Sequence, residues 1–360
     1  MLSFKSPRLG AFMEKVVRRS SITGKPYEYN IIYDHRNTSQ DYVKIAVFMA
    51  FEQSRYDREV LHGQMADVER RLSLQGKNVI FCVYAISHNA PRAYEILSSA
   101  LIEHKDLYLA VPIGDYPARV LADICDSLGR DQPILFVDVI NPLVAGMVDA
   151  FGEPFENRTG VMKIRPAYQQ LTEFLSSQKP DLKHILVLHD SHYAIRKTPE
   201  RVTIGQALTD TRFSVEHHVM SGEMDTTAEL FKKISDFQGI VLDHDATIGR
   251  RDIEQLVELC NTTGTLLITT DATGVYLGAG VGIGNTGYAQ GNALVPKILE
   301  YSQGKPLSKI PITDLADNEN ISFNPGTKCK QGLFCDRSTD AALRAKSIEE
   351  VYFEYQQLKG

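Results

Sequence analysis

The chain has 360 residues, 43% of them hydrophobic and 23% charged, and its formal net charge is -6. This length accommodates two domains of ordinary size, and the composition is that of a soluble globular protein. No long basic block interrupts the acidic balance, and no apolar run approaches the roughly 20 residues that cross a bilayer. We therefore expect neither a nucleic-acid surface nor a membrane span.

Residues 1–42 form an N-terminal extension to the clearer pattern that follows. Basic residues recur before position 30, but no uninterrupted apolar stretch of about 7–15 residues follows them, as a secretory signal requires. Three interpretations stay open: the chain stays in the cytoplasm, its export segment has been removed, or the sequence does not begin at its natural start.

Short apolar runs then alternate with longer segments of helical periodicity. The runs predict strands at 43–48, 78–84, 107–111, 134–139, 184–188, 213–219, 239–242 and 265–269. Apolar residues three and four apart predict helices at 57–74, 90–105, 116–128, 142–151, 166–178, 226–235 and 251–262. Several strands are rich in Val, Ile and Leu without alternation, which indicates that they are covered on both faces.

The strand–helix–strand order predicts an α/β fold with mainly parallel sheets and right-handed crossovers. The polar stretch 152–159 separates two such series, which favours two lobes over one large sheet. A second unusual segment, 278–291, holds six glycines and is typical of a hinge crossing or a ligand-facing loop.

The five cysteines fall into two groups. Cys82, Cys125 and Cys260 lie inside apolar segments, which predicts buried thiols. Cys329 and Cys335 flank a turn-like stretch whose spacing permits either a disulfide or two unpaired thiols. No Cys and His residues have the spacing of a zinc site, and we expect neither a metal nor a cofactor.

Two features invite an enzymatic interpretation. The GVGIG sequence at 280–284 lacks the following strand and acidic residue that a dinucleotide site needs. His189, His192 and His244 fall at strand carboxyl ends, where polar residues of any open α/β sheet collect. No set of nucleophile, base and orienting residue is visible, so an enzyme that uses these histidines as acids or bases is the less favoured alternative.

Several motifs in fixed order resemble one protein family between about 43 and 323. They are KIAVFMAFEQSRYD at 44–57, GDYPARVLA at 114–122, NPLVAGMV at 141–148, NRTGV at 157–161, DAT at 245–247, Asp271, the Gly278–Ala279 pair, GKP at 304–306 and IPI at 310–312. The chain is similar to the substrate-binding proteins of ABC importers with the type I periplasmic-binding fold, in the group that includes tryptophan- and tyrosine-type receptors.

The resemblance implies two lobes, each with a mainly parallel sheet flanked by helices, joined by a hinge that the chain crosses several times. Lobe 1 is expected at 43–141 plus about 285–305, lobe 2 at 142–284 plus about 306–326, and a C-terminal tail at 327–360. It also implies a small-molecule ligand, no catalytic activity, an extracytoplasmic location and an ABC permease as partner.

The family's pattern places ligand-binding residues at strand carboxyl ends. These are Met49, Phe51, Glu52, Asp115, Tyr116, Asn141, Asp190, Asp245, Ala246, Thr247 and Asp271. Helix N-termini there suit a carboxylate, acidic residues such as Glu52 suit an amine, and Phe51 and Tyr116 suit an aromatic portion.

Four residues at or near these positions differ from the residues usual in the family. Asn141 replaces an Asp, Ala246 replaces an Asn, Met49 replaces a Gln, and Arg119 stands where Gln is common. An aromatic amino acid therefore does not follow from the resemblance alone. A cytoplasmic ligand sensor of the same fold is the main alternative to a transport receptor.

Overall fold

The computed structural model describes most of the chain. The described residues are 11–20, 22–34, 42–49, 59–61, 63, 68, 71–72, 75–86, 90–139, 141–149, 152–155, 157–162, 168–189, 208, 212–219, 232–242, 250–270, 272–315, 321–324, 331 and 346–347.

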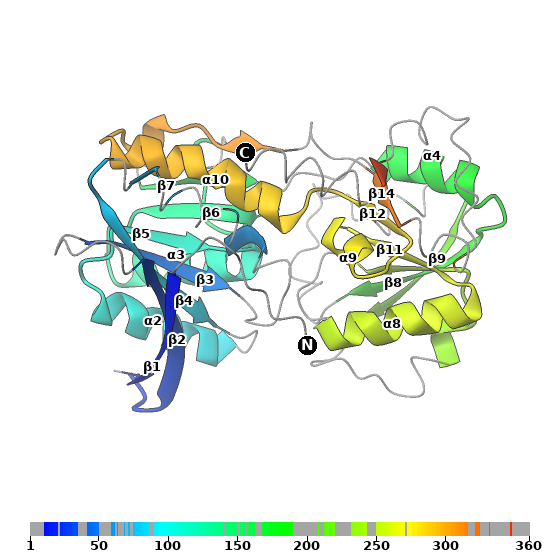
Figure 1. Cartoon of the computed structure of the whole chain (residues 1–360), viewed down its shortest axis with the longest axis horizontal. Helices are drawn as coiled ribbons and strands as arrows, with labels where there is room; N and C mark the ends of the chain where they lie inside the picture. Colours follow the sequence, from blue (N-terminus) through cyan, green and yellow to red (C-terminus); the bar gives the residue numbers. More distant parts are fainter. Residues whose placement is uncertain are drawn as a thin grey trace. The chain divides into compact units, whose positions relative to one another are not determined.

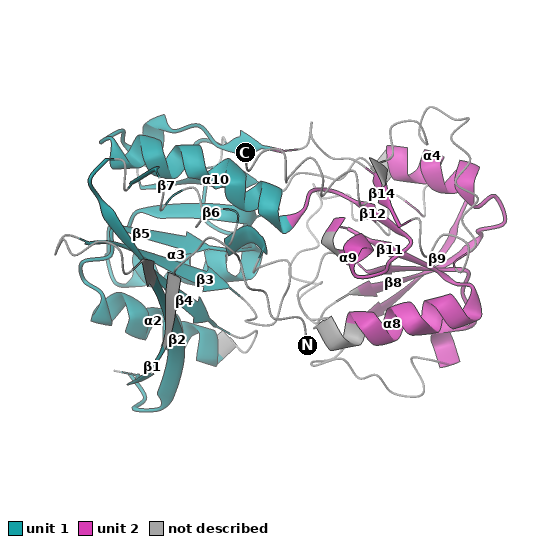
Figure 2. Cartoon of the chain, in the orientation of Figure 1, with its two compact units in different colours: residues 1–52, 56–163, 287–314 teal, residues 53–55, 164–286, 315–360 magenta. Residues whose placement is uncertain are grey.

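The chain divides into two compact units, coloured separately in Figure 2. Unit 1 comprises Met1–Glu52, Tyr56–Lys163 and Gly287–Asp314, and unit 2 comprises Gln53–Arg55, Ile164–Thr286 and Leu315–Gly360. The chain thus passes from one unit to the other several times. The division differs from the boundary expected near 142, because the segment up to 162 adds a strand to the sheet of unit 1.

Unit 1 contains an eight-stranded sheet in the order β1-β2-β4-β3-β5-β6-β7-β13 (Figure 1). Its strands are β1 (Ala11–Arg19), β2 (Pro26–Asp34), β3 (Tyr42–Met49), β4 (Asn78–Ala85), β5 (Leu109–Pro112), β6 (Ile134–Val139), β7 (Arg158–Met162) and β13 (Thr313–Asp314). From β4 to β13 all neighbours run parallel, while β1 and β2 are antiparallel to each other and β2 is antiparallel to β4.

Helices α2 (Ala90–Glu103) and α3 (Asp115–Ser127) pack on one face of this sheet. The buried side chains of this core include Phe48, Tyr84 and Phe136, which lie beneath apolar residues of both helices. Helix α10 (Gly287–Ser302) lies against β6 and β7 and is followed by the short 3-10 helix η1 (Leu307–Lys309). Apolar strands with covered faces are what the continuous apolar runs predict.

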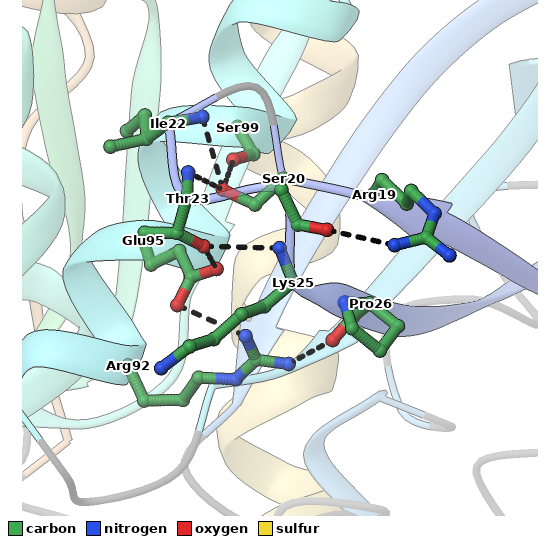
Figure 3. A network of polar contacts seen from close by, with 10 residues as sticks. Arg19, Ser20, Ile22, Thr23, Lys25, Pro26, Arg92, Glu95 and Ser99 are labelled. Atoms are coloured by element: carbon green, nitrogen blue, oxygen red, sulfur yellow. Dashed lines mark hydrogen bonds and ion pairs between the residues drawn. The ribbon is translucent and has the colours of Figure 1, made fainter.

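The β1–β2 hairpin belongs to unit 1 and is fastened along one side of α2. Glu95, Ser99 and Glu103 are four residues apart, so they form a polar stripe on one face of the helix. At the hairpin turn, Thr23 donates to Glu95 and Ser99 donates to Ser20 (Figure 3).

Glu103, the last residue of α2, contacts the two strands of the hairpin close to the turn. Tyr27 of β2 donates to Glu103 Oε2, and Arg18 Nε of β1 lies 2.9 Å from Glu103 Oε1. Tyr29 stacks on Tyr84 of β4 with 4.7 Å between ring centroids. The first 42 residues therefore contribute two strands and buried aromatic side chains to the core of unit 1.

Unit 2 contains a seven-stranded sheet in the order β15-β14-β12-β11-β10-β8-β9. Its strands are β8 (His184–His189), β9 (Ser214–Val219), β10 (Gly239–Leu242), β11 (Leu266–Thr269), β12 (Val281–Ile283), β14 (Ile321–Phe323) and β15 (Lys346–Ser347). The described helices of this unit include α4 (Tyr168–Gln178), α8 (Arg250–Thr263) and α9 (Ala272–Tyr276). The strands are parallel except for the antiparallel β12–β14 pair, so the prediction of two mainly parallel sheets is confirmed.

The glycine-rich segment 278–291 contains β12, an internal strand that pairs with β11 and β14, and it also contains a passage of the chain between the two units at residues 286–287, as expected of a hinge crossing. One local prediction is wrong. Residues 142–149, the described part of the helix predicted at 142–151, instead form a turn, in which Gly146 adopts a φ of 68° and Val148 forms a β-bridge with Pro154. The burial of Cys82, Cys125 and Cys260 is confirmed.

Candidate functional site

In unit 1 the candidate site lies where β5 ends and α3 begins. Gly114 precedes the helix with a φ of 88°, a conformation that favours glycine. The Gly114 N–H donates to Val137 O of β6, and the Ile113 N–H donates to Phe48 O of β3, both at 2.9 Å. These bonds hold the first turn of α3 at the carboxyl edge of three parallel strands, where ligands of open α/β sheets bind.

Asp115 and Asn141 meet at this edge. Asp115 is the first residue of α3, and its Oδ1 accepts a 2.9 Å hydrogen bond from the Asn141 backbone N–H, 26 residues later. The Asn141 side-chain oxygen accepts from the Val144 N–H at 3.1 Å and so closes the turn after β6. The structure therefore brings together two predicted site residues that are distant in sequence.

Tyr116 and Met49 lie near the same edge but differ in exposure. Tyr116 is partly buried against the α2–α3 core, and this burial raises the pKa of its hydroxyl above the usual value. Met49 ends β3 and is 2% exposed, with its carbonyl oxygen accepting from the Ile86 N–H. In this conformation Met49 is part of the core of unit 1.

Asp138 is a polar residue of the same edge that the sequence analysis missed. It is 3% exposed, has a φ of 59°, and interrupts the β6–β7 register between Val137 and Val139. A non-glycine residue with positive φ at a bulge is a strained feature that concentrates at functional sites. A lone acidic residue within an otherwise apolar strand was the sequence signal for it.

In unit 2 the corresponding edge is formed by the carboxyl ends of β8, β10 and β11, which are parallel neighbours. Thr270, directly after β11, is 2% exposed, and its hydroxyl donates to Leu242 O, the last carbonyl of β10, at 3.5 Å. The remaining predicted residues fall outside the described residues: Phe51, Glu52, Asp190, Asp245, Ala246, Thr247 and Asp271.

The described residues hold no group of three His, Cys, Asp or Glu side chains placed to bind a metal. Within the same part of the chain, no helix combines the length and apolar character needed to cross a bilayer. Cys329, Cys335, His192 and His244 also lie outside the described residues.

Several solved structures share this architecture at low sequence identity. An ABC domain from Streptococcus pneumonia in complex with L-Trp is 17% identical, with a TM-score of 0.68 over 85% of this chain and 99% of that one. A conserved domain protein from Vibrio cholerae is 18% identical, with a TM-score of 0.71 and the same coverage. A ligand-free, open substrate-binding protein with adhesive properties from Clostridium difficile is 18% identical, with a TM-score of 0.57 over 85% of this chain and 98% of that one. These likenesses confirm the type I periplasmic-binding-like fold.

The family follows from the sequence match. The model of the ABC transporter substrate binding protein family matches residues 75–340, so the chain belongs to this family of solute-binding receptors. The family is a substrate-binding class, and membership implies a small-molecule ligand and an ABC permease as partner. No curated protein matches the chain significantly. Strands β1, β2 and β3 precede the matched residues.

Proposed function

We propose that this chain is the extracytoplasmic substrate-binding component of an ABC importer and that its ligand is an amino-acid-like or aromatic metabolite. The observation that carries the proposal is the family match over residues 75–340. The L-Trp in the Streptococcus pneumonia structure supports an amino-acid-like ligand, and the departures at Asn141 and Ala246 leave the side chain of that ligand open.

The described part of the site suits such a ligand. The first turn of α3 presents backbone N–H groups and the positive end of the helix dipole, which attract a carboxylate. The Asp115 carboxylate stands in the same turn and accepts from the Asn141 N–H, and Tyr116 is the next residue of the helix. A zwitterion with an apolar or aromatic side chain matches these groups.

The binding test uses isothermal titration calorimetry and thermal shift with the purified full chain. The panel consists of the twenty amino acids, beginning with L-tryptophan, and the nucleobases. We expect one ligand to bind at a single site and to raise the melting temperature. Absence of binding up to millimolar concentration would refute the proposed ligand class.

The role of Asp115 is tested with a matched variant on the same helix. Asp115→Ala removes the acceptor for the Asn141 N–H and the acidic group of the edge, and we expect about tenfold weaker binding of the panel ligand. Asp123→Ala is the control, because Asp123 is exposed and only reaches Arg119 at 3.9 Å. Equal affinities of the two variants would show that Asp115 does not contribute to the site.

Location and partnership have their own tests. Cell fractionation distinguishes an extracytoplasmic receptor from a cytoplasmic sensor of the same fold. Adjacent genes for a permease and an ATPase, and lost uptake of the ligand when this gene is deleted, are expected for a transport receptor. A cytoplasmic protein with unaffected uptake would instead be a sensor.

A further inference from the structure

Gln290 has a buried side-chain amide that bonds to none of the residues described by the structure. It lies in the first turn of α10 and is 1% exposed. Both its Nε2 and its Oε1 are shielded from solvent, and none of the residues that the structure describes forms a hydrogen bond with either atom. A side-chain amide offers two N–H donors and an acceptor oxygen, and buried amides in proteins are usually bonded.

The position of Gln290 along α10 places its amide toward the binding edge of unit 1. The other end of α10 lies near the starts of β4 and β5, where Ser302 O accepts from Lys77 Nζ at 2.6 Å and Tyr301 O accepts from the Tyr108 hydroxyl at 3.4 Å. Gln290 precedes Ser302 by about 18 Å of helix. The first turn of α10 therefore lies toward the carboxyl ends of the strands.

The same turn directly follows a passage of the chain between the two units. The second segment of unit 2 ends at Thr286 and unit 1 resumes at Gly287, three residues before Gln290. The turn is also tightly packed, since a Cβ at Gly63 would stand 2.4 Å from Tyr288 O and 3.1 Å from the Asn292 backbone nitrogen. The backbone of this turn is therefore in close contact with the chain at Gly63.

We infer that Gln290 is a positioning residue for the bound state: its buried amide, which bonds to none of the described residues in this conformation, gains hydrogen bonds when the ligand binds. This inference rests on the proposed function and adds a residue to it. A buried amide without partners disfavours the conformation that contains it, so forming its bonds in another conformation shifts the balance toward that conformation.

The test is Gln290→Met, which keeps the length of the side chain and removes its donors and acceptor. We expect the ligand-free variant to melt about 2–4 °C above the wild type, because the uncompensated burial of the amide is gone. We expect the same variant to bind the panel amino acid at least about fivefold more weakly in calorimetry, because the bonds of the bound state are gone. A merely structural residue would not change stability and affinity in opposite directions.

Gln132→Met is the matched control. Gln132 is also in unit 1 and 2% exposed, but its Nε2 donates to Pro133 O at 3.3 Å and its Oε1 accepts from Arg130 at 3.0 Å. Removing a bonded amide leaves its partners unsatisfied, so we expect this variant to melt below the wild type.

The outcomes distinguish a failure of the Gln290 inference from a failure of the proposed function. A Gln290→Met variant that melts lower, as the control does, overturns the inference, since an ordered water then satisfies the amide in the free protein. A higher melting temperature with unchanged affinity also overturns it. If the wild type itself binds nothing in the panel, the proposed function fails, and the inference fails with it for that distinct reason.

Discussion

Removing the Glu103 carboxylate should weaken the attachment of the N-terminal hairpin to α2. Glu103 accepts from two hairpin residues, the buried Tyr27 and the exposed Arg18. A hydrogen bond from a buried hydroxyl to a carboxylate contributes about 1.5–3 kcal/mol, whereas an ion pair with an exposed partner contributes about 0–1 kcal/mol. Glu103→Ala is therefore expected to lower the free energy of unfolding by about 2–4 kcal/mol.

This loss corresponds to a melting temperature about 5–10 °C lower for a unit of this size. The assay is thermal and urea unfolding of the full chain, combined with hydrogen–deuterium exchange of peptides from β1 and β2. Glu103→Gln keeps an oxygen acceptor for Tyr27 and should lose less stability. Glu28→Ala is the control on the same hairpin, because Glu28 pairs with Lys15 and both side chains are more than half exposed.

The reasoning is refuted if Glu103→Ala melts within about 1 °C of Glu28→Ala and the exchange of β1 and β2 is unchanged. The hairpin would then be held by its strand pairing with β4 and by the stacking of Tyr29 on Tyr84, without help from the polar stripe of α2.

Two further changes test the packing of each unit. Burial lowers the pKa of Lys297, which donates to Pro311 O, to about 8 from its ordinary value of 10.5. Between these pH values the unfolded chain binds a proton that the folded chain does not. The stability of the wild type relative to Lys297→Met, measured by urea unfolding, should therefore rise from pH 7.5 to 9.5. Parallel pH profiles of the two proteins would contradict this expectation. Gly280→Ala should cost about 1–3 kcal/mol, because its Cβ would meet Gln331 Oε1 at 2.5 Å and Leu266 Cδ1 at 2.7 Å. Combined with Gln331→Ala, it should lose less than the sum of the two single changes in the same assay; full additivity would show that the predicted clash is absent.

The site was predictable in part, because its residues follow directly after strands that have a strong local signal. Asp115 and Asn141 come after apolar runs, and carboxyl ends of parallel strands share one edge, so their proximity follows from the alternation of strand and helix. Asp138 was marked in the sequence only as a lone acidic residue in an apolar strand, and no local pattern marked Gln290. A positive φ and an unbonded buried amide depend on the surrounding packing, which no local pattern records.

The apolar runs by themselves determined the two α/β series and where most of the parallel strands lie along the chain, because burial on both faces of a parallel strand imposes a continuous apolar sequence. The alternation of Tyr27, Glu28 and Tyr29 is also a strand signal, with both tyrosines buried and the glutamate exposed. Only the tertiary structure decided that this strand pairs with β4 and that Glu103 of α2 holds it. It likewise decided that β12 pairs with β11 and β14, and that the space beside Gly280 is occupied by Gln331, 51 residues later. Pairing and close packing join residues that are far apart in the chain, so the physical constraint on each lies outside its own neighbourhood.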